Sequence, residues 1–291
     1  MGPGESIIDW GDGCVESFNI GLFNNDINHS YSDSFIEDHT DKTFNVIVDG
    51  NIYLILSNQE SGASNSGLRS LIVNVMPLSH KQSSACNLFQ FCTNLKSIPS
   101  DLFNYCEIEN FMMCFLGSGI EYIPKTLFDN ADKESNFYSA FENCQSLKVS
   151  DLEFNSKVAS TFSIFHSMFK DCNSLETISP GTFKNVNVKS DFKYCFDRCS
   201  ELKIPDHLLD SCYKSEVRYM FSNLISESNS KDIPTDLFSK FDENVLSSSD
   251  EAFRPFAITD EDESHKMRKA LFHSKIKLNV GKTQVNLYDL V

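Results

Sequence analysis

The sequence of 291 residues is poor in basic residues, and it contains a single tryptophan, eight prolines and twelve glycines. Lysine and arginine number 25 against 41 aspartates and glutamates, which gives a formal net charge of −16. Because nucleic acids and anionic lipids are bound by clustered basic residues, this deficit argues against both as partners. No apolar stretch approaches the ~20 residues of a membrane-spanning helix, so we predict no membrane insertion.

The motifs of common catalytic and cofactor sites are also missing. The chain contains no G-x-S-x-G, H-E-x-x-H, phosphate-loop or G-x-G-x-x-G pattern. Of the seven histidines only His29 falls within a motif, where fixing a turn is its simpler role. Asp9 and Asp12 offer the oxygen ligands that Ca²⁺ prefers, but a carboxylate in a glycine-flanked turn more often bonds to the turn itself. We therefore predict that the protein is not an enzyme and holds no cofactor or metal.

The chain has ten cysteines, which would allow five disulfides in an exported protein. No two of them are spaced as C-x-x-C, the pattern of zinc fingers and thioredoxin-like sites. Most recur on the apolar side of the repeat described next, where cysteine acts as a small buried hydrophobic residue. Buried free thiols are the favoured interpretation and a disulfide set is the alternative. Free thiols, and an N-terminus (MGPGESIIDWGDG) without a secretory signal pattern, favour assembly inside a cell.

Phenylalanine, which occurs 25 times, marks an internal repeat of about 26 residues. Around Phe141, apolar residues lie four and one positions earlier and Cys144 lies three positions later. Offsets of i, i+3, i+4 and i+7 share one face of a helix, so the pattern predicts about two helical turns per repeat. The same pattern recurs at spacings of 26, 26, 28, 27 and 25 around Phe89, Phe115, Phe141, Phe169, Phe196 and Phe221.

A short strand is predicted after each of these helices, at an isoleucine or valine that a proline often follows. Proline ends a strand because it lacks the N–H for a further ladder bond, and it suits the first position of a helix. A second helical turn is predicted after each strand, as at Phe103. Single units of this kind cannot close a core, so we predict a stack of units with a parallel sheet running along it. The predicted strand positions are Ile98, Ile123, Val149, Ile178, Ile204 and Ile233.

Two features vary between the repeats. The third unit lacks the isoleucine–proline pair and continues as KVSDLEFNSKVASTFSIF, so we expect a locally distorted turn there. In addition, the residue after the leucine or isoleucine that precedes each predicted strand alternates in charge from repeat to repeat. Neighbours in a parallel stack lie ~4.8 Å apart, where opposite charges contribute about 0.2–1 kcal/mol per pair. An exposed ladder that maintains register is the favoured interpretation, and an interaction face is the alternative, for Lys96, Glu121, Lys148, Glu176 and Lys203.

The repeat resembles the BspA-like leucine-rich repeat family, whose signature is approximately M-F-x-x-C-x-x-L-x-x-I-P-x-x-L-F-x-x-C. That signature is matched by LFQFCTNLKSIPSDLFNYC at 88–106, by MFKDCNSLETI at 168–178 and by CFDRCSELKIP at 195–205. The resemblance covers about residues 85–241. It implies a leucine-rich-repeat solenoid that serves adhesion or assembly rather than catalysis.

The N-terminal segment resembles a PKD-type immunoglobulin-like domain. The resemblance rests on IDWGDG, which ends at Gly13, on His29 and Tyr31, and on TFNVIV at 43–48. It covers roughly residues 1–56 and implies a small β-sandwich in which the strand before the WGDG hairpin is almost missing. A sandwich that lacks a strand has an open edge, to which a partner chain can add a strand. We predict that this unpaired edge is formed by Ile7, Ile8, Asp9 and Trp10.

These patterns predict an α+β fold in four parts. They are a PKD-like β-sandwich at 1–56, a linker with a capping strand at 57–84, about six leucine-rich repeats with short parallel strands and short helices at 85–245, and a C-terminal segment at 246–291. The C-terminal segment offers a short helix and two strands around Gly281, which form either a terminal cap or a docking segment.

The two resemblances together predict the function. PKD-like and BspA-like units occur together in surface proteins of gut bacteria and in structural proteins of their phages. The expected free thiols, the missing signal pattern and the open edge favour a non-enzymatic phage virion component, such as a fibre, collar or capsid decoration, assembled in the host cytoplasm. Its expected partners are other protein chains, including copies of itself, or a host-surface glycan or protein. The alternative is a bacterial cell-surface adhesin or glycan-binding protein.

Overall fold

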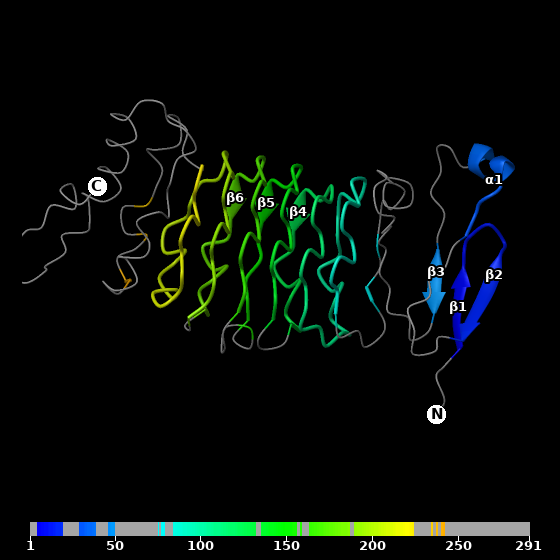
Figure 1. Cartoon of the computed structure of the whole chain (residues 1–291), viewed down its shortest axis with the longest axis horizontal. Coiled ribbons are helices and arrows are strands. Elements are labelled where there is room, and N and C mark those ends of the chain that lie inside the picture. The colour runs from blue at the N-terminus through cyan, green and yellow to red at the C-terminus, as the bar shows by residue number, and fades with distance from the viewer. Residues whose placement is uncertain are drawn as a thin grey trace, which may run out of the picture.

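The computed structural model describes residues 5–19, 29–38, 46–49, 75, 77–78, 84–131, 135–155, 158, 163–186, 189–223, 234, 237 and 240–241. The predicted linker at 57–84 lies almost wholly outside these residues, and the C-terminal segment at 246–291 lies entirely outside them. The described residues fall into two groups (Figure 1). One is a small N-terminal sheet with a helix, and the other is a series of stacked coils within 84–223, here called the coil stack.

The N-terminal group is built around a tight hairpin. Gly11 and Gly13 have φ angles of 81° and 90°, in the left-handed region that glycine enters without a steric penalty. This turn lets the two flanking strands pair antiparallel, and a third strand joins them in the order β2-β1-β3. The elements are β1 (Glu5–Asp9), β2 (Val15–Asn19), α1 (Asp33–Asp38) and β3 (Ile47–Asp49).

The prediction of an unpaired edge at Ile7, Ile8, Asp9 and Trp10 is wrong. β1 is the middle strand of the sheet, because β3 pairs with it on the side that was expected to be open. Trp10 follows the strand, and its N–H donates to the Cys14 carbonyl across the turn at 3.0 Å. The described residues of the N-terminal group form this one sheet, so the sandwich stays a prediction. Ile7, Ile8 and Asp9 pair with Ser17, Glu16 and Val15 on one side and with Asp49, Val48 and Ile47 on the other.

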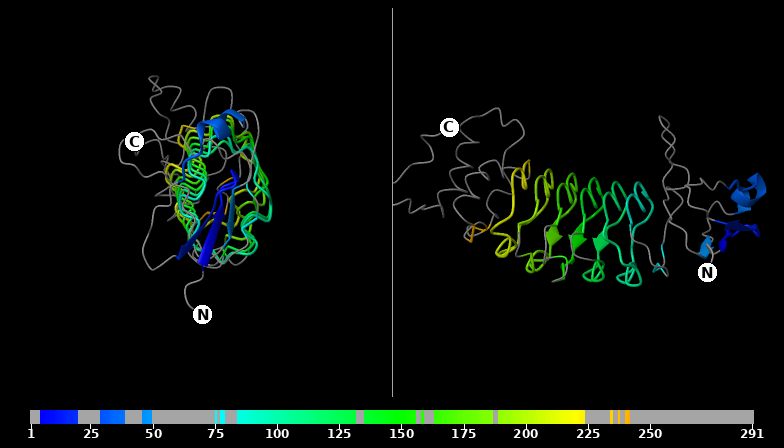
Figure 2. Two further views of the ribbon diagram at one scale, coloured as in Figure 1. Left: turned by 90° about the vertical axis from the view of Figure 1, so that its right-hand side faces the viewer. Right: turned by 60° about the horizontal axis from the view of Figure 1, so that its bottom comes forward.

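Backbone hydrogen bonds join each coil of the stack to the next along two walls. On the first wall most of the bonds run forward: the N–H groups of residues 85, 87, 89 and 91 donate to the carbonyls of residues 110, 112, 114 and 116 at 2.7–3.0 Å. The same four-bond pattern recurs at every later coil of the described stack up to Arg198. A column of parallel bridges lies on this wall and runs from Ser84 to Glu216. Seen end-on, the coils superimpose on one another (Figure 2).

The second wall carries a parallel sheet, as predicted, at the strand positions Ile123, Val149 and Ile178. Ile98 and Ile204 do not lie in strands, and Ile233 lies outside the described residues. The sheet consists of β4 (Tyr122–Ile123), β5 (Val149–Ser150) and β6 (Thr177–Ile178), and a further parallel bridge joins Thr177 to Lys203. Here the bonds run backward, since the N–H of Glu121 donates to the Lys96 carbonyl of the preceding coil. The strands are only two residues long.

The prediction of short helices in each repeat is wrong for the described part of the coil stack, which contains no α-helix. Around each repeat phenylalanine the chain forms successive turns in which an N–H bonds three residues back, as from Leu88 to Ala85 and from Cys92 to Phe89. Left-handed residues, which interrupt an α-helix, lie two positions before and after the phenylalanine. Turns of this length bury the same i, i+3, i+4 and i+7 positions as a helix. The left-handed residues are Asn87, Phe91, Met113, Gly117, Ser139, Asn143, Ser167, Asp171, Tyr194, Arg198, Tyr219 and Asn223.

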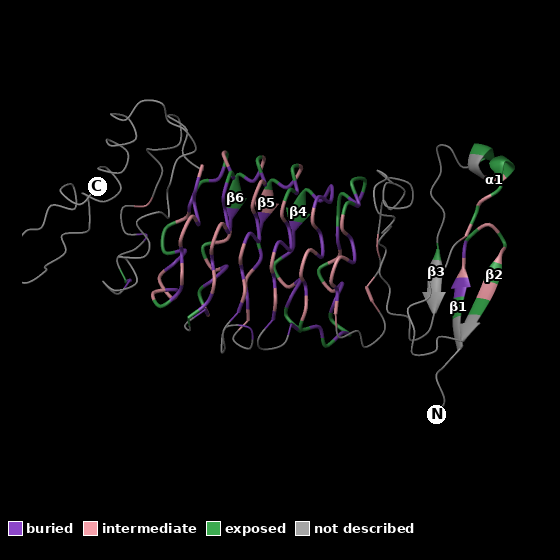
Figure 3. Ribbon diagram, viewed as in Figure 1, coloured by how far each residue is buried: buried purple, intermediate pink, exposed green. Residues whose placement is uncertain are grey.

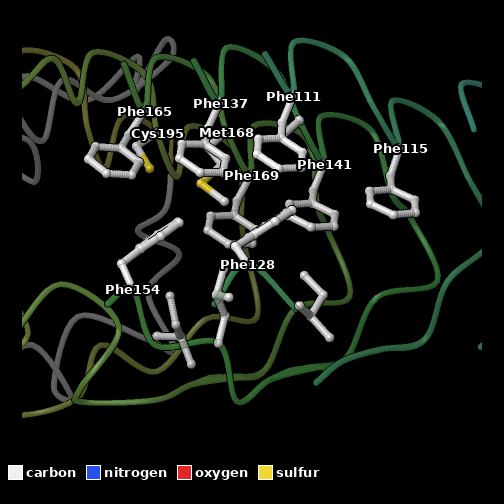
Figure 4. Packing of buried hydrophobic residues seen from close by; sticks show 14 of the residues in the cluster. Phe111, Phe115, Phe128, Phe137, Phe141, Phe154, Phe165, Met168, Phe169 and Cys195 are labelled. Carbon is white, nitrogen blue, oxygen red and sulfur yellow. The ribbon is translucent and has the colours of Figure 1, made fainter. Parts of the chain in front are cut away.

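Three columns of stacked phenylalanine rings fill the interior (Figure 4). Along the first column, from Phe89 to Phe221, ring centroids lie 5.2–5.5 Å apart. A second column consists of Phe111, Phe137, Phe165 and Phe192, and a third consists of Phe103, Phe128, Phe154 and Phe183. The third column meets the second at steep angles, and each such aromatic pair contributes about 0.5–1.5 kcal/mol beyond its buried area. Buried residues therefore recur at the same places in successive coils (Figure 3).

The third repeat departs from the pattern at one buried position. Val149 lies in a strand as predicted, but the residue of β5 that pairs with Ile123 and with Ile178 is Ser150. The strand therefore keeps its register, and a serine replaces an isoleucine in the buried column. The turn that we expect to be distorted lies partly outside the described residues. Ser150 is fully buried and its hydroxyl has no hydrogen-bond partner. An unpaired buried polar group costs about 1–3 kcal/mol, so this coil carries a local destabilisation.

Replacing Ser150 with alanine is expected to raise the free energy of unfolding by about 1 kcal/mol, because the unpaired hydroxyl is removed. Chemical denaturation of the full chain measures the change. Ser179→Ala is the matched control, since the Ser179 hydroxyl accepts the Gly181 N–H and donates to Glu153. The control is expected to lower stability. Equal losses in both variants would show that the Ser150 hydroxyl is satisfied.

A second pair of variants isolates the strain of the left-handed positions. Ser139 has a φ of 52°, is fully buried and has an unpartnered hydroxyl. Ser139→Ala removes the hydroxyl but keeps a Cβ in the left-handed region, whereas Ser139→Gly removes both. Glycine is expected to be more stable than alanine here by roughly 0.5–1 kcal/mol, the reverse of the usual order. An alanine variant as stable as the glycine variant would contradict a strained backbone.

Candidate interaction surfaces

A cluster of side chains holds the GDG turn in place. The rings of Trp10 and His29 stack with centroids 4.5 Å apart, and His29 Nε2 lies 2.9 Å from Asp12 Oδ2. Asp12 Oδ1 accepts the backbone N–H of Cys14, and the Tyr31 hydroxyl donates to the Trp10 carbonyl. The Cys14 N–H and His29 lower the pKa of Asp12. The predicted turn role of Asp12 and His29 is therefore confirmed.

The predicted row of alternating charges is exposed and continuous. Its backbone is joined step by step along the second wall of the coil stack, with N–H to carbonyl distances of 2.9–3.0 Å. Within the described residues the five side chains make no ion pair with one another, so backbone bonds and buried packing set the register there. The row consists of Lys96, Glu121, Lys148, Glu176 and Lys203, all of which face solvent.

Ion pairs between neighbouring coils do form, but at positions that the alternation in sequence did not identify. Glu153 is bound by Lys125 and Lys184, and the hydrogen bond from Lys184 lowers the pKa of the Glu153 carboxyl. Pairs of this kind help to fix each coil on its neighbour, although partly exposed pairs contribute little individually. Further inter-coil pairs among the described residues include Glu142–Lys170 at 3.0 Å, Asp171–Arg198 at 3.1 Å and Lys193–Glu216 at 3.1 Å.

A row of half-buried aromatic side chains crosses four successive coils, and sequence reasoning missed it. It consists of Tyr138, His166, Tyr194 and Tyr219, here called the aromatic stripe. Consecutive ring centroids lie 5.1, 5.7 and 4.9 Å apart. The first two residues lie three positions before their repeat phenylalanine and the last two lie two positions before it. When the repeats are aligned on their phenylalanines, these four residues therefore fall at two different positions, although the coils place them in one row.

Charged groups flank the aromatic stripe. His166 Nδ1 lies 3.4 Å from Asp191 Oδ2, and the other Asp191 oxygen accepts the Lys193 N–H at 2.9 Å. Burial opposes ionisation of Asp191, but the bonds from His166 and Lys193 outweigh it and lower the pKa of this carboxyl. Glu216 then links Lys193 to Arg218. The stripe is thus bordered by charges of both signs.

The ring orientations limit what the stripe can bind. Tyr194 and Tyr219 are inclined by only 15°, and Tyr138 and His166 by 29°, so the rings of each pair turn their faces toward one another. A sugar or a cation that stacks on an aromatic face needs that face to be free. The faces that the rings of each pair turn toward one another are therefore closed to such a ligand. Tyr residues are enriched at the centres of protein–protein interfaces.

The ten cysteines are all free thiols, and eight of them are buried, as predicted for the repeat positions. Three thiols each donate to a phenylalanine carbonyl of the preceding coil: Cys144 to Phe115, Cys172 to Phe141 and Cys199 to Phe169, at 2.9–3.0 Å. Burial raises the pKa of the thiols of Cys114, Cys172, Cys195, Cys199 and Cys212. These groups are structural and unsuited to nucleophilic chemistry, which requires the thiolate.

Comparison of the chain with protein-family models, with curated proteins and with solved structures found no match. The BspA-like and PKD-like resemblances therefore stay predictions. No helix in the described part of the chain has the length and apolar character needed to cross a membrane. Where the structure is described, one group of three metal-ligating side chains comes together, formed by Cys14, Glu16 and His29.

In the native protein, maleimide at mildly alkaline pH is expected to modify Cys14 and Cys86, the two half-buried thiols, and no others. The remaining eight are buried and are expected to react only after unfolding. Peptide mapping by mass spectrometry before and after denaturation measures this. If Cys144 or Cys172 reacted in the native state as fast as Cys86, the packing of the coil stack would be wrong.

Proposed function

We propose that the protein is a non-enzymatic recognition and assembly protein whose coil stack binds another protein chain along the aromatic stripe. The observation that carries this proposal is the alignment of Tyr138, His166, Tyr194 and Tyr219 over four coils. Aromatic residues dominate the energetic centres of protein interfaces, and the flanking charges of both signs supply specificity for one partner and register.

The coil stack supports this role by its rigidity. Three of the four residues of the stripe bond through their own backbone to a neighbouring coil, as where the Tyr194 N–H donates to the Arg218 carbonyl. Side chains and loops that are ordered before binding lose little entropy when a partner arrives. A preformed linear surface of this kind suits an extended or repetitive partner.

The setting that we favour is a phage virion, in which the protein would serve as a fibre, collar or capsid decoration. Ten free thiols suit assembly in a reducing cytoplasm, and both resemblances are to units found in such structural proteins. The alternative is a bacterial surface adhesin, which the BspA-like resemblance also implies. Because the paired stripe faces are occupied, protein recognition fits this surface better than glycan stacking.

Mass spectrometry of particle, envelope and cytosol fractions, with thiols alkylated at lysis, distinguishes these settings. Recovery in phage particles with alkylated cysteines is the expected result. Recovery in the envelope would favour the adhesin, and paired cysteines there would contradict the thiol assignment.

Cross-linking in that fraction identifies the partner chain, and the purified protein can then be titrated with it. Tyr138→Ala and Tyr219→Ala are each expected to weaken binding at least about tenfold, as loss of an interface anchor does. Lys148→Ala and Glu176→Ala, in the row of alternating charges on the second wall, serve as controls and should change affinity less than about threefold. Loss of binding in the controls alone would move the interface to the charged row.

A further inference from the structure

The β1–β2 hairpin gathers metal-ligating side chains on one face. Side chains alternate along a strand, and Ile8 pairs directly with Glu16 across the hairpin. Ile8 and Trp10 are buried, whereas Ile7 and Val15 are 41% and 61% exposed on the other face. Cys14 and Glu16, two residues apart, therefore point to the same side as Trp10.

His29 completes the cluster from a separate segment of the chain. Its ring lies on the Trp10 indole, inclined by 7°, which brings it over the face that carries Cys14 and Glu16. The Cys14 sulfur, one Glu16 oxygen and one His29 nitrogen all lie within 4.8 Å of one another. An ion at the centre of this triangle would lie about 2.8 Å or less from each atom. Side-chain shifts of less than ~1 Å then reach the bond lengths of zinc, about 2.0–2.3 Å.

We propose that Cys14, Glu16 and His29 form a zinc site. A thiolate, an imidazole and a carboxylate together form a donor set typical of Zn²⁺, whereas Ca²⁺ and Mg²⁺ take oxygen ligands. Three protein ligands leave a fourth tetrahedral position for water, as in open zinc sites. The site is independent of the proposed partner binding on the coil stack.

Two neighbouring groups already orient the ligands. The Trp10 indole N–H donates to Glu16 Oε2 at 2.8 Å, which leaves the second carboxylate oxygen available. Asp12 Oδ2 lies 2.9 Å from His29 Nε2 and fixes the plane of the imidazole. Outer groups that bond to metal ligands in this way commonly change metal affinity by about 10–100-fold.

The site contains its own spectroscopic reporter, because Trp10 is the one tryptophan of the chain. Co²⁺ replaces Zn²⁺ in such sites and, unlike Zn²⁺, absorbs visible light. Titration of the metal-free full chain with Co²⁺ is expected to give one equivalent bound, a thiolate-to-cobalt charge-transfer band and quenching of Trp10 emission. Addition of Zn²⁺ should then abolish the band. A titration without a charge-transfer band would overturn the site.

Variants test which thiol is the ligand. Cys14→Ser is expected to abolish the charge-transfer band, and Asp12→Asn should weaken affinity about 10–100-fold. Cys86→Ser, which changes the other half-buried thiol, is the matched control and should bind as the wild type does. A band that survives in Cys14→Ser, or that disappears in Cys86→Ser, would contradict the proposal.

Altered Trp10 emission in the metal-free Cys14→Ser variant would reveal that this variant does not fold. A measurement on the wild-type chain then tests the site instead. Zn²⁺ is expected to slow maleimide labelling of Cys14 at least about tenfold and to leave the labelling of Cys86 unchanged. Equal labelling of Cys14 with and without Zn²⁺ would show that the thiol does not ligate the metal.

Discussion

The four forward hydrogen bonds between each coil and the next are the interaction on which the rest of the stack depends. They use every second N–H around a repeat phenylalanine, and the intervening N–H groups close turns within the coil. Two of the four donors in each coil are left-handed residues, which cost about 1–2 kcal/mol when they carry a Cβ. Such a backbone is stable only against a neighbour that accepts its bonds, so a single coil cannot hold this shape alone.

Once this register is set, the interior follows from it. Equivalent residues lie about one strand spacing apart, and a phenylalanine ring stacked on the next at 5.2–5.5 Å fits that spacing. Cysteine suits the position three residues later because it is small, tolerates burial and donates a weak hydrogen bond to a carbonyl of the preceding coil. The unusual composition, with many phenylalanines and cysteines, is thus a direct result of the repeat.

The sequence allowed the repeat, its buried positions and its parallel strands to be predicted, because these depend on local periodicity. Helices were predicted wrongly because turns with a left-handed residue bury the same spacing as a helix, and hydrophobic periodicity does not report φ. The pairing of β3 with β1 and the choice of Ser150 over Val149 depend on register between distant segments. The aromatic stripe and the Cys14–Glu16–His29 cluster escaped notice for a related reason. Their members share no repeat position or short spacing, and only the fold brings them together.

The opposite directions of the hydrogen bonds on the two walls have an electrostatic consequence. In an α-helix all peptide dipoles point the same way, so its ends attract ions of opposite sign. In the coil stack most bonds of the first wall donate toward the C-terminal coils, as from Phe89 to Cys114, and the second wall donates toward the N-terminal coils, as from Glu121 to Lys96. The peptide dipoles of the two walls therefore partly oppose one another, unlike those of an α-helix. In the proposed assembly role, the charges that attract a partner are those of the side chains displayed along the length of the stack.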